Sequence, residues 1–261
     1  MPFLFVDRFD FINIRNVCFL FIAFCLTSSA VYIMNDLFDI KNDKKHFQKM
    51  NRPIAQGKIN KNNALILMFG FLLLGVVLAG IHNIYCFYIL LCYFILNIFY
   101  SLYLKNLAII DIISISFGFV LRILSGYAMV KISPSLFIIL LVFCTAFLFT
   151  LIKRKYEFVL LGACARKSLQ KYDIRLINKF ININIIVIIF IHIMFMKKYL
   201  FSQDLMLFIA LISIIINILI MFRLKKLSDK MIWQCDFISC IVKDKKLFVL
   251  FILCLITLIY A

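Results

Sequence analysis

Three aspartates stand at helical spacing where the first long apolar stretch of the chain ends. Asp36, Asp39 and Asp43 occupy positions i, i+3 and i+7 of the segment NDLFDIKND, which begins at Asn35. On a helix these positions fall on one face, so we expect the three carboxylates to converge on one site. Amide and carboxylate oxygens are the ligands that a hard dication such as Mg²⁺ prefers. A magnesium site formed by Asn35, Asp36, Asp39 and Asp43 is therefore one interpretation, and a solvated helix end is the other.

Basic residues follow the acidic segment at once and favour the first interpretation. Lys49 and Arg52 belong to the stretch KMNRP, and Gly57 comes shortly after it. Mg²⁺ in proteins usually takes part of its coordination from a substrate phosphate, and cationic side chains beside it help to hold that phosphate. The segment as a whole therefore predicts a site for a phosphorylated substrate.

The complete pattern, NDxxDxxxD followed by KxxRP and a glycine, resembles the first signature of the UbiA superfamily of membrane-embedded transferases. The resemblance implies an all-helical membrane fold that binds a diphosphate through Mg²⁺. It also implies which residues serve catalysis, by stabilising the departing diphosphate: Asp36, Asp39, Lys49, Arg52 and Lys105.

Two later stretches narrow the resemblance to one branch of the family. YSxxLKxxxxxD followed by GFVLRxxxG, and LIKRKYEF farther on, are similar to the branch of the decaprenyl-phosphate phosphoribosyltransferases. That likeness implies transfer of 5-phosphoribose from 5-phosphoribosyl 1-diphosphate to a polyprenyl phosphate, with release of diphosphate. The residues that it implies for substrate binding are Tyr100, Asp111, Arg122, Lys153, Arg154 and Glu157.

Asp111 and Arg122 lie within an apolar stretch, where ionisable groups are costly and usually face the interior of a helical bundle or a polar cavity. Arg122 would either anchor an anionic group at membrane depth or pair with carbonyls or a neighbouring helix. The sequence leaves both possibilities open.

Two other functions compete with phosphoribosyl transfer. Family members that alkylate aromatic rings carry a second aspartate-rich run, DxxxD, where this chain has Lys153, Arg154 and Glu157. The cations there suit a donor with an extra phosphate better than a second diphosphate-bound metal. The alternative is a prenyltransferase that moves a polyprenyl group from its diphosphate to an aromatic or other small acceptor. A non-enzymatic transporter or scaffold is the third possibility, and it leaves the acidic triplet without a role.

The elements that position these residues must cross a membrane. Of 261 residues 65% are hydrophobic, and the mean hydropathy is +1.06, far above the range of soluble domains. A spanning helix takes about 20 mostly apolar residues. We expect a single polytopic domain over 1–261, all-α, with about eight spans and without the helix that usually precedes the first signature. The expected spans are 17–34, 64–82, 84–103, 107–130, 134–152, 180–196, 203–222 and 246–260.

The formal net charge of +17 does not indicate nucleic acid, because most basic residues fall in loops between the apolar stretches. Their placement follows the positive-inside rule and puts the acidic segment on the cytoplasmic face, in a bacterial inner membrane. Nine cysteines show no metal-binding spacing and are expected to be small buried residues. Gly70, Gly75 and Gly80 are expected to allow close packing of helices.

Overall fold

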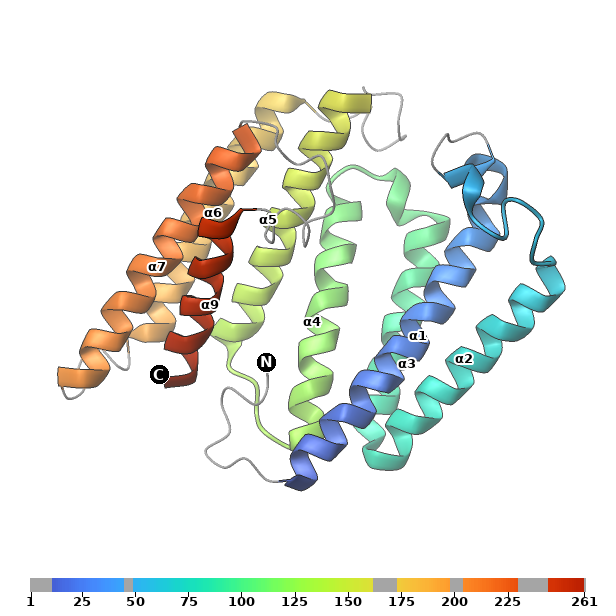
Figure 1. Cartoon of the computed structure of the whole chain (residues 1–261), viewed down its shortest axis with the longest axis horizontal. Coiled ribbons are helices and arrows are strands. Elements are labelled where there is room, and N and C mark those ends of the chain that lie inside the picture. The colour runs from blue at the N-terminus through green and yellow to red at the C-terminus, as the bar shows by residue number, and fades with distance from the viewer. Residues whose placement is uncertain (1–10, 45–48, 162–172, 198–203, 230–243, 261) are drawn as a thin grey trace. The chain divides into compact units, whose positions relative to one another are not determined.

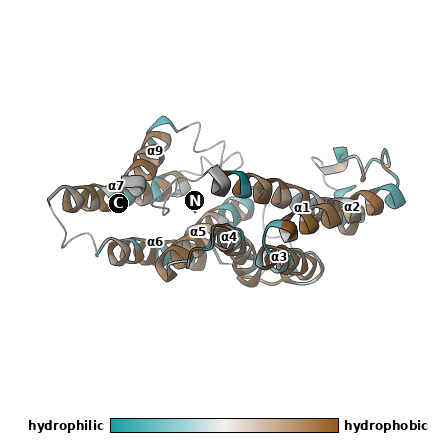
Figure 2. Ribbon diagram, turned by 90° about the horizontal axis from the view of Figure 1, so that it is seen from below, coloured by the Kyte–Doolittle hydropathy of each residue, from teal (hydrophilic) through white to brown (hydrophobic). Residues whose placement is uncertain are grey.

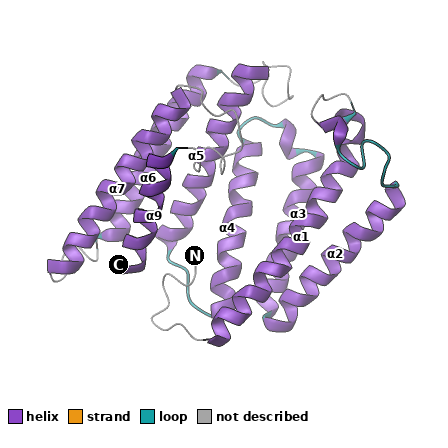
Figure 3. Ribbon diagram, viewed as in Figure 1, coloured by secondary structure: helices purple, strands orange, loops and turns teal. Residues whose placement is uncertain are grey.

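The computed structural model describes residues 11–44, 49–161, 173–197, 204–229 and 244–260, and all regular structure within these ranges is helical (Figures 1 and 3). Two short 3-10 turns, η2 (Lys49–Asn51) and η3 (Leu104–Asn106), accompany eight α-helices in this part of the chain. The α-helices are α1 (Phe11–Asp43), α2 (Lys61–His82), α3 (Ile84–Leu102), α4 (Ile110–Val130), α5 (Leu136–Leu161), α6 (Ile174–Met196), α7 (Asp204–Asp229) and α9 (Lys245–Tyr260).

The helices α1 to α7 are long and apolar enough to cross a membrane, which makes seven candidate spans within the described ranges. Apolar residues dominate these helices along most of their length (Figure 2). The helix α9 has 16 residues, fewer than the roughly 20 of a typical span. The all-α, polytopic membrane fold that the sequence predicts is therefore confirmed.

The helix ends differ from the expected spans where charged residues follow an apolar stretch. The helix α1 continues through the acidic segment to Asp43, and α5 continues to Leu161. Lys153, Arg154 and Glu157 therefore lie on a helix that continues nine residues beyond the end of the expected span 134–152. Lys, Arg and Glu are good helix formers, so the helix extends past the apolar stretch without a Gly or Pro to end it.

The chain forms two compact units, of which unit 1 holds Met1–Ser114 and Val120–Pro134. In unit 1, α1 packs against α2 and α3, and α2 packs against α3. A Cβ atom added at Gly75 would lie 2.6 Å from Thr27 Oγ1 and 2.8 Å from the Ala23 carbonyl oxygen. The absence of a side chain at Gly75 therefore permits the close contact of α1 with α2.

Successive helices of unit 1 run antiparallel, which defines its two ends (Figure 1). We call the end where α1 and α3 finish and α2 and α4 begin the acidic end, because α1 brings the aspartates there (Figure 1). The opposite end holds the turn at Asn83, between α2 and α3, and the last turn of α4.

Unit 2 holds Ile115–Phe119 of α4 and the residues from Ser135 onward. Within it α5 packs against α6, α6 against α7, and α7 against α9. Polar side chains join these helices: Lys155 Nζ lies 3.0 Å from Asp229 Oδ1, and His192 Nε2 lies 3.0 Å from the Ser213 hydroxyl. The organisation of residues 1–261 as a single domain stays a prediction.

Candidate active site

Two of the three aspartates meet on one guanidinium nitrogen at the acidic end. Arg52 Nη1 donates to Asp36 Oδ1 at 2.5 Å and to Asp43 Oδ2 at 3.0 Å. The Asp43 side chain is only 3% exposed, whereas that of Arg52 is 39% exposed. Because an unpaired buried carboxylate is costly, Arg52 stabilises Asp43 in its place and draws Asp36 to the same point.

A tight turn after α1 presents Arg52. The amide of Gln56 donates to the Arg52 carbonyl at 2.9 Å, and the amide of Lys58 donates to the Pro53 carbonyl at 3.0 Å. Gly57 has a φ of +77°, a left-handed conformation that glycine adopts without steric cost. The Arg-Pro pair and the glycine of the sequence pattern thus belong to one turn that folds back toward α1. The side chain of Lys49 lies outside the described residues.

The third aspartate has its own cation, which comes from the chain after α3. Lys105 Nζ in η3 donates to Asp39 Oδ1 at 2.7 Å, and both side chains are about a quarter exposed. The Ser101 hydroxyl, one turn before Lys105, donates to Asn35 Oδ1. Ser101 at the end of α3 and Lys105 in η3 therefore hold Asn35 and Asp39, as the Arg52 turn holds Asp36 and Asp43.

The donor chemistry of this cluster fits a hard dication, although the carboxylates contact cationic side chains. Within the described ranges no three His, Cys, Asp or Glu side chains gather closely enough to hold a metal ion. Asp36 and Asp43 converge on Arg52, while Asp39 turns to Lys105. The four side chains Asn35, Asp36, Asp39 and Asp43 offer only oxygen acceptors to a cation, which is the donor set that Mg²⁺ prefers.

Arg122 lies on α4 toward the middle of unit 1. Its Nη2 donates to the Tyr93 hydroxyl at 2.8 Å and lies 3.5 Å from the Ser28 hydroxyl. The guanidinium carbon also lies 5.3 Å from the centre of the Tyr93 ring, a cation–π distance. Arg122 thus contacts α3 and α1, which is the pairing with neighbouring helices that the sequence allowed, and it is an exposed residue.

Asp111 is fully buried in the first turn of α4, at the acidic end, and not at mid-span. Its carboxylate accepts the amide hydrogen of Ile112 at 2.9 Å, in the turn where the helix dipole favours a negative charge. Ile109, just before it, has a φ of +68°, which is an outlier for a β-branched residue. Tyr100 is half-buried near the end of α3. Asp111 and Tyr100 thus lie at the same end of unit 1 as the aspartates.

The residues expected to bind substrate on α5 belong to unit 2. Arg154 is 2% exposed and donates from Nη1 to Glu157 Oε2 at 2.6 Å, one helical turn away. Lys153 is exposed. Lys155, which the sequence analysis did not single out, is buried and lies 3.3 Å from the Ser228 hydroxyl in addition to its contact with Asp229.

Sequence reasoning missed the partners that hold the predicted residues in place. Ser101, Tyr93 and Ser28 are uncharged, and each lies far along the chain from the residue that it contacts. Only Ser101 had a local signal, since it stands between Tyr100 and Lys105 in the YSxxLK stretch.

The chain matches the model of the UbiA prenyltransferase family over residues 2–241. It is 33% identical over 174 residues to the decaprenyl-phosphate phosphoribosyltransferase of Corynebacterium glutamicum, covering 61% of this chain and 50% of that protein. It is 31% identical over 173 residues to the decaprenyl-phosphate phosphoribosyltransferase of Mycobacterium tuberculosis, covering 63% of this chain and 56% of that protein. The chain thus spans about half the length of these curated relatives.

A solved structure supports the fold independently of close sequence likeness. The structure of a UbiA homologue from Archaeoglobus fulgidus bound to GPP and Mg²⁺ superposes with a TM-score of 0.72 at 16% identity. The superposition covers 94% of this chain and 88% of that chain. At this identity the likeness concerns the fold alone.

Proposed function

Because the chain belongs to the UbiA prenyltransferase family, we propose that it is an Mg²⁺-dependent enzyme that transfers 5-phosphoribose from 5-phosphoribosyl 1-diphosphate to a polyprenyl phosphate. The names of its relatives from Corynebacterium and Mycobacterium support this reaction. The observation that carries the proposal is the set of ion pairs at the acidic end, where Arg52 and Lys105 contact all three aspartates. One place thus offers oxygen ligands for a metal and cations for a diphosphate.

Asn35, Asp36, Asp39 and Asp43 would hold the metal in this proposal. When bound, Mg²⁺ would supply positive charge that stabilises the negative charge developing on the departing diphosphate. The bond between ribose C1 and the diphosphate oxygen would break, a phosphate oxygen of the polyprenyl phosphate would bond to C1, and diphosphate would leave. The ribose would acquire oxocarbenium character, as in other glycosyl transfers.

Arg52 and Lys105 are proposed to bind the diphosphate of the donor substrate. Both donate to carboxylates in the structure, and both have side chains that are at least a fifth exposed. A substrate diphosphate therefore can reach them. Charge-assisted hydrogen bonds from these cations to phosphate oxygens strengthen as the leaving group gains charge, which is the condition for lowering the barrier. Lys49, which belongs to the same basic stretch, is proposed for the same task.

The remaining residues would bind the two substrates. Lys153 and Arg154 are proposed for the 5-phosphate of the donor, and Tyr100, Asp111, Arg122 and Glu157 complete the set carried over from the family branch. The acceptor is already an anion, so the reaction does not require a general base. The acidic end faces the cytoplasm of a bacterial inner membrane in this proposal, as the placement of basic residues favours.

A second candidate is transfer of a prenyl group from its diphosphate to a small acceptor. The family description and the GPP-bound Archaeoglobus homologue favour it. It uses the same acidic end, because both donors carry a diphosphate. The two candidates differ only in the group that is transferred and in the acceptor that receives it.

An assay with purified protein in lipid distinguishes the candidates. Labelled phosphoribosyl diphosphate, polyprenyl phosphate and Mg²⁺ should yield labelled lipid. Label entering a product only from a prenyl diphosphate would support the second candidate. Neither product from folded protein, across acceptors of several chain lengths, would contradict both.

Two matched substitutions test the role of the carboxylates. Asp36→Asn and Asp39→Asn each remove a charge without changing shape and should lower the transfer rate by at least about a hundredfold. The control is Asp173→Asn, which makes the same change at the N-cap of α6, where the side chain accepts the Arg175 amide. Asparagine also caps helices well, so this control should keep the wild-type rate. Full activity in either cluster variant would contradict the proposed metal role.

A further inference from the structure

Polar residues at the end of α3 meet α1 in one register. Ser101 of α3 contacts Asn35, and Lys105, four residues later in η3, contacts Asp39, which lies four residues after Asn35 on α1. Both contacts join residues 66 positions apart. The uncharged pair thus lies directly beside the charged one, so a change at Ser101 reaches the acidic segment without touching an aspartate.

The hydroxyl of Ser101 lies between two oxygen atoms. Its Oγ contacts Asn35 Oδ1 and lies 2.8 Å from the carbonyl oxygen of Asn97, four residues earlier on α3. Ser101 is only 3% exposed, so water does not compete freely for the hydroxyl. A serine hydroxyl carries one proton, and its oxygen also accepts. Ser101 therefore donates to one of these two oxygens at a time, and beside Asn35 it can act as donor or as acceptor.

The orientation of the Asn35 amide decides which of its atoms is left for a cation. The amide carries the acceptor Oδ1 on one side and the donor Nδ2 on the other. With Oδ1 against Ser101, the amide leaves Nδ2, whose hydrogens carry partial positive charge and repel a cation. With Nδ2 donating to Ser101, the amide leaves Oδ1, which is the kind of ligand that Mg²⁺ prefers.

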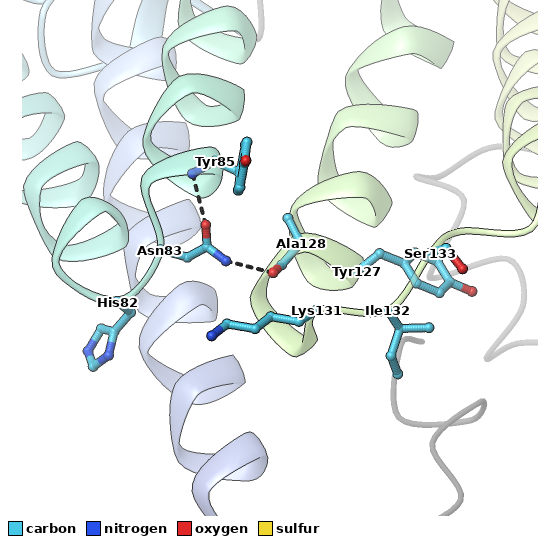
Figure 4. A pocket seen from close by; sticks show the side chains of 8 residues that line it. All are labelled: His82, Asn83, Tyr85, Tyr127, Ala128, Lys131, Ile132 and Ser133. Atoms are coloured by element: carbon cyan, nitrogen blue, oxygen red, sulfur yellow. Dashed lines mark hydrogen bonds between the residues drawn. The ribbon is translucent and has the colours of Figure 1, made fainter.

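Asn83, at the opposite end of unit 1, shows how fixed partners orient an amide. Its Nδ2 donates to the Ala128 carbonyl at 2.7 Å, and its Oδ1 accepts the Tyr85 amide hydrogen at 2.8 Å (Figure 4). Neither backbone group can exchange donor and acceptor roles, so a single orientation satisfies both. A hydroxyl partner imposes no such restriction.

We propose that Ser101 is a positioning residue that holds the Asn35 amide with Oδ1 toward the metal. In this arrangement the Ser101 hydroxyl donates to the Asn97 carbonyl, which is already within hydrogen-bond distance, and accepts from Asn35 Nδ2. The inference rests on the proposed function, in which Asn35 is a metal ligand. Residues that orient a ligand in this way typically change metal affinity by about tenfold to a hundredfold when they are removed.

The test measures Mg²⁺ binding by the purified full-length protein in detergent, independently of activity. The melting temperature is followed during titration with MgCl₂ at a fixed concentration of inorganic diphosphate, because a ligand of the folded state raises it. Ser101→Ala should weaken the apparent Mg²⁺ affinity at least about tenfold.

Ser125→Ala is the matched control. Ser125 is a fully buried serine of α4 whose hydroxyl donates to the Arg122 carbonyl at 2.8 Å, one turn earlier on the helix. The substitution therefore removes the same kind of hydroxyl from the same unit, away from the acidic segment, and should leave the Mg²⁺ affinity unchanged. An equal loss of Mg²⁺ affinity in both serine variants would count against the proposal.

Asn35→Asp separates orientation from packing. A carboxylate presents an oxygen on both sides, so no partner has to select one. In the Asn35→Asp background, Ser101→Ala should change the Mg²⁺ affinity by less than about twofold. If Ser101→Ala weakens Mg²⁺ binding equally in both backgrounds, the hydroxyl only supports the packing of α3 against α1, and the proposal is wrong.

The same titrations separate this inference from the proposed function. A wild-type protein that does not respond to Mg²⁺ would overturn the metal role of the acidic segment and this inference with it. A wild-type response that Ser101→Ala keeps in full overturns only the orientation of Asn35. Should Ser101→Ala fail to fold, Ser101→Cys gives the same decision, because a thiol fills the space but forms weak hydrogen bonds.

Discussion

Arg52 stabilises two carboxylates with one nitrogen, and one of them, on Asp43, is almost completely buried. The shared face of the aspartates could be predicted from the sequence, because i, i+3 and i+7 spacing on α1 leaves no other arrangement. Their partners could not, since Ser101 and Lys105 are each 66 positions from the residue that they contact. Tertiary packing of α3 against α1 brings them together, and no local pattern records such packing.

At the residue scale, we expect Arg52→Ala to destabilise the protein through Asp43. Removing the guanidinium leaves a buried carboxylate unpaired, at a cost of about 1–2 kcal/mol after allowance for the exposure of Arg52. Adding Asp43→Asn should restore part of the lost stability, because the neutral amide tolerates burial better. Melting temperatures of the two single variants and the double variant in detergent measure this coupling. Strictly additive effects would show that Arg52 does not stabilise Asp43.

At the element scale, hydropathy predicted where the helices run better than where they end. Each expected span lies largely within a helix, because about 20 apolar residues in sequence suit little else in a membrane. The helical spacing of the aspartates already predicted that α1 continues to Asp43, whereas the charged continuation of α5 to Leu161 was not predicted. Hydropathy indicates where the apolar stretch stops, whereas helix propensity influences where the helix stops. In α5 the two differ because Lys153, Arg154 and Glu157 are good helix formers.

The contact of α1 with α2 supports a paired prediction on glycines. Gly75→Ala should destabilise the protein by about 1–3 kcal/mol, because the new methyl group would overlap the Ala23 carbonyl, which is backbone and cannot turn aside. Gly70→Ala, one and a half turns earlier on α2, meets nothing within 4 Å. It should be neutral or stabilising by up to about 1 kcal/mol. Thermal unfolding of the two variants in the same detergent checks the contrast, and equal effects would contradict the close approach.

At the scale of the whole molecule, the family and the helical membrane fold that the sequence predicted are confirmed. The match over residues 2–241 and the seven candidate spans within the described ranges agree on an integral membrane protein. The direction of insertion stays a prediction, because it depends on the cell and not on the helices alone. The predicted direction of insertion is based on the basic residues near the acidic end.

Accessibility of single cysteines tests that direction. In a variant whose nine cysteines are replaced by serine or alanine, Gln56→Cys and Ser133→Cys place one thiol at each end of unit 1, and both positions are exposed. A membrane-impermeant maleimide added to intact cells should label Ser133→Cys and spare Gln56→Cys until the cells are opened. The reverse pattern would put the aspartates outside the cell, where they could not bind the proposed phosphoribosyl diphosphate from the cytoplasm.

The ion pairs at the acidic end also mean that the protein carries its own counter-ions for the aspartates. A dication entering there must displace Arg52 and Lys105, and by itself it leaves both without a partner. A diphosphate that arrives with the metal would accept hydrogen bonds from both displaced side chains. We therefore expect magnesium and diphosphate to enter as a cooperative pair, each raising the affinity for the other by the same factor. Calorimetric titrations with magnesium alone, with diphosphate alone and with both together would measure how much each ligand raises the affinity for the other.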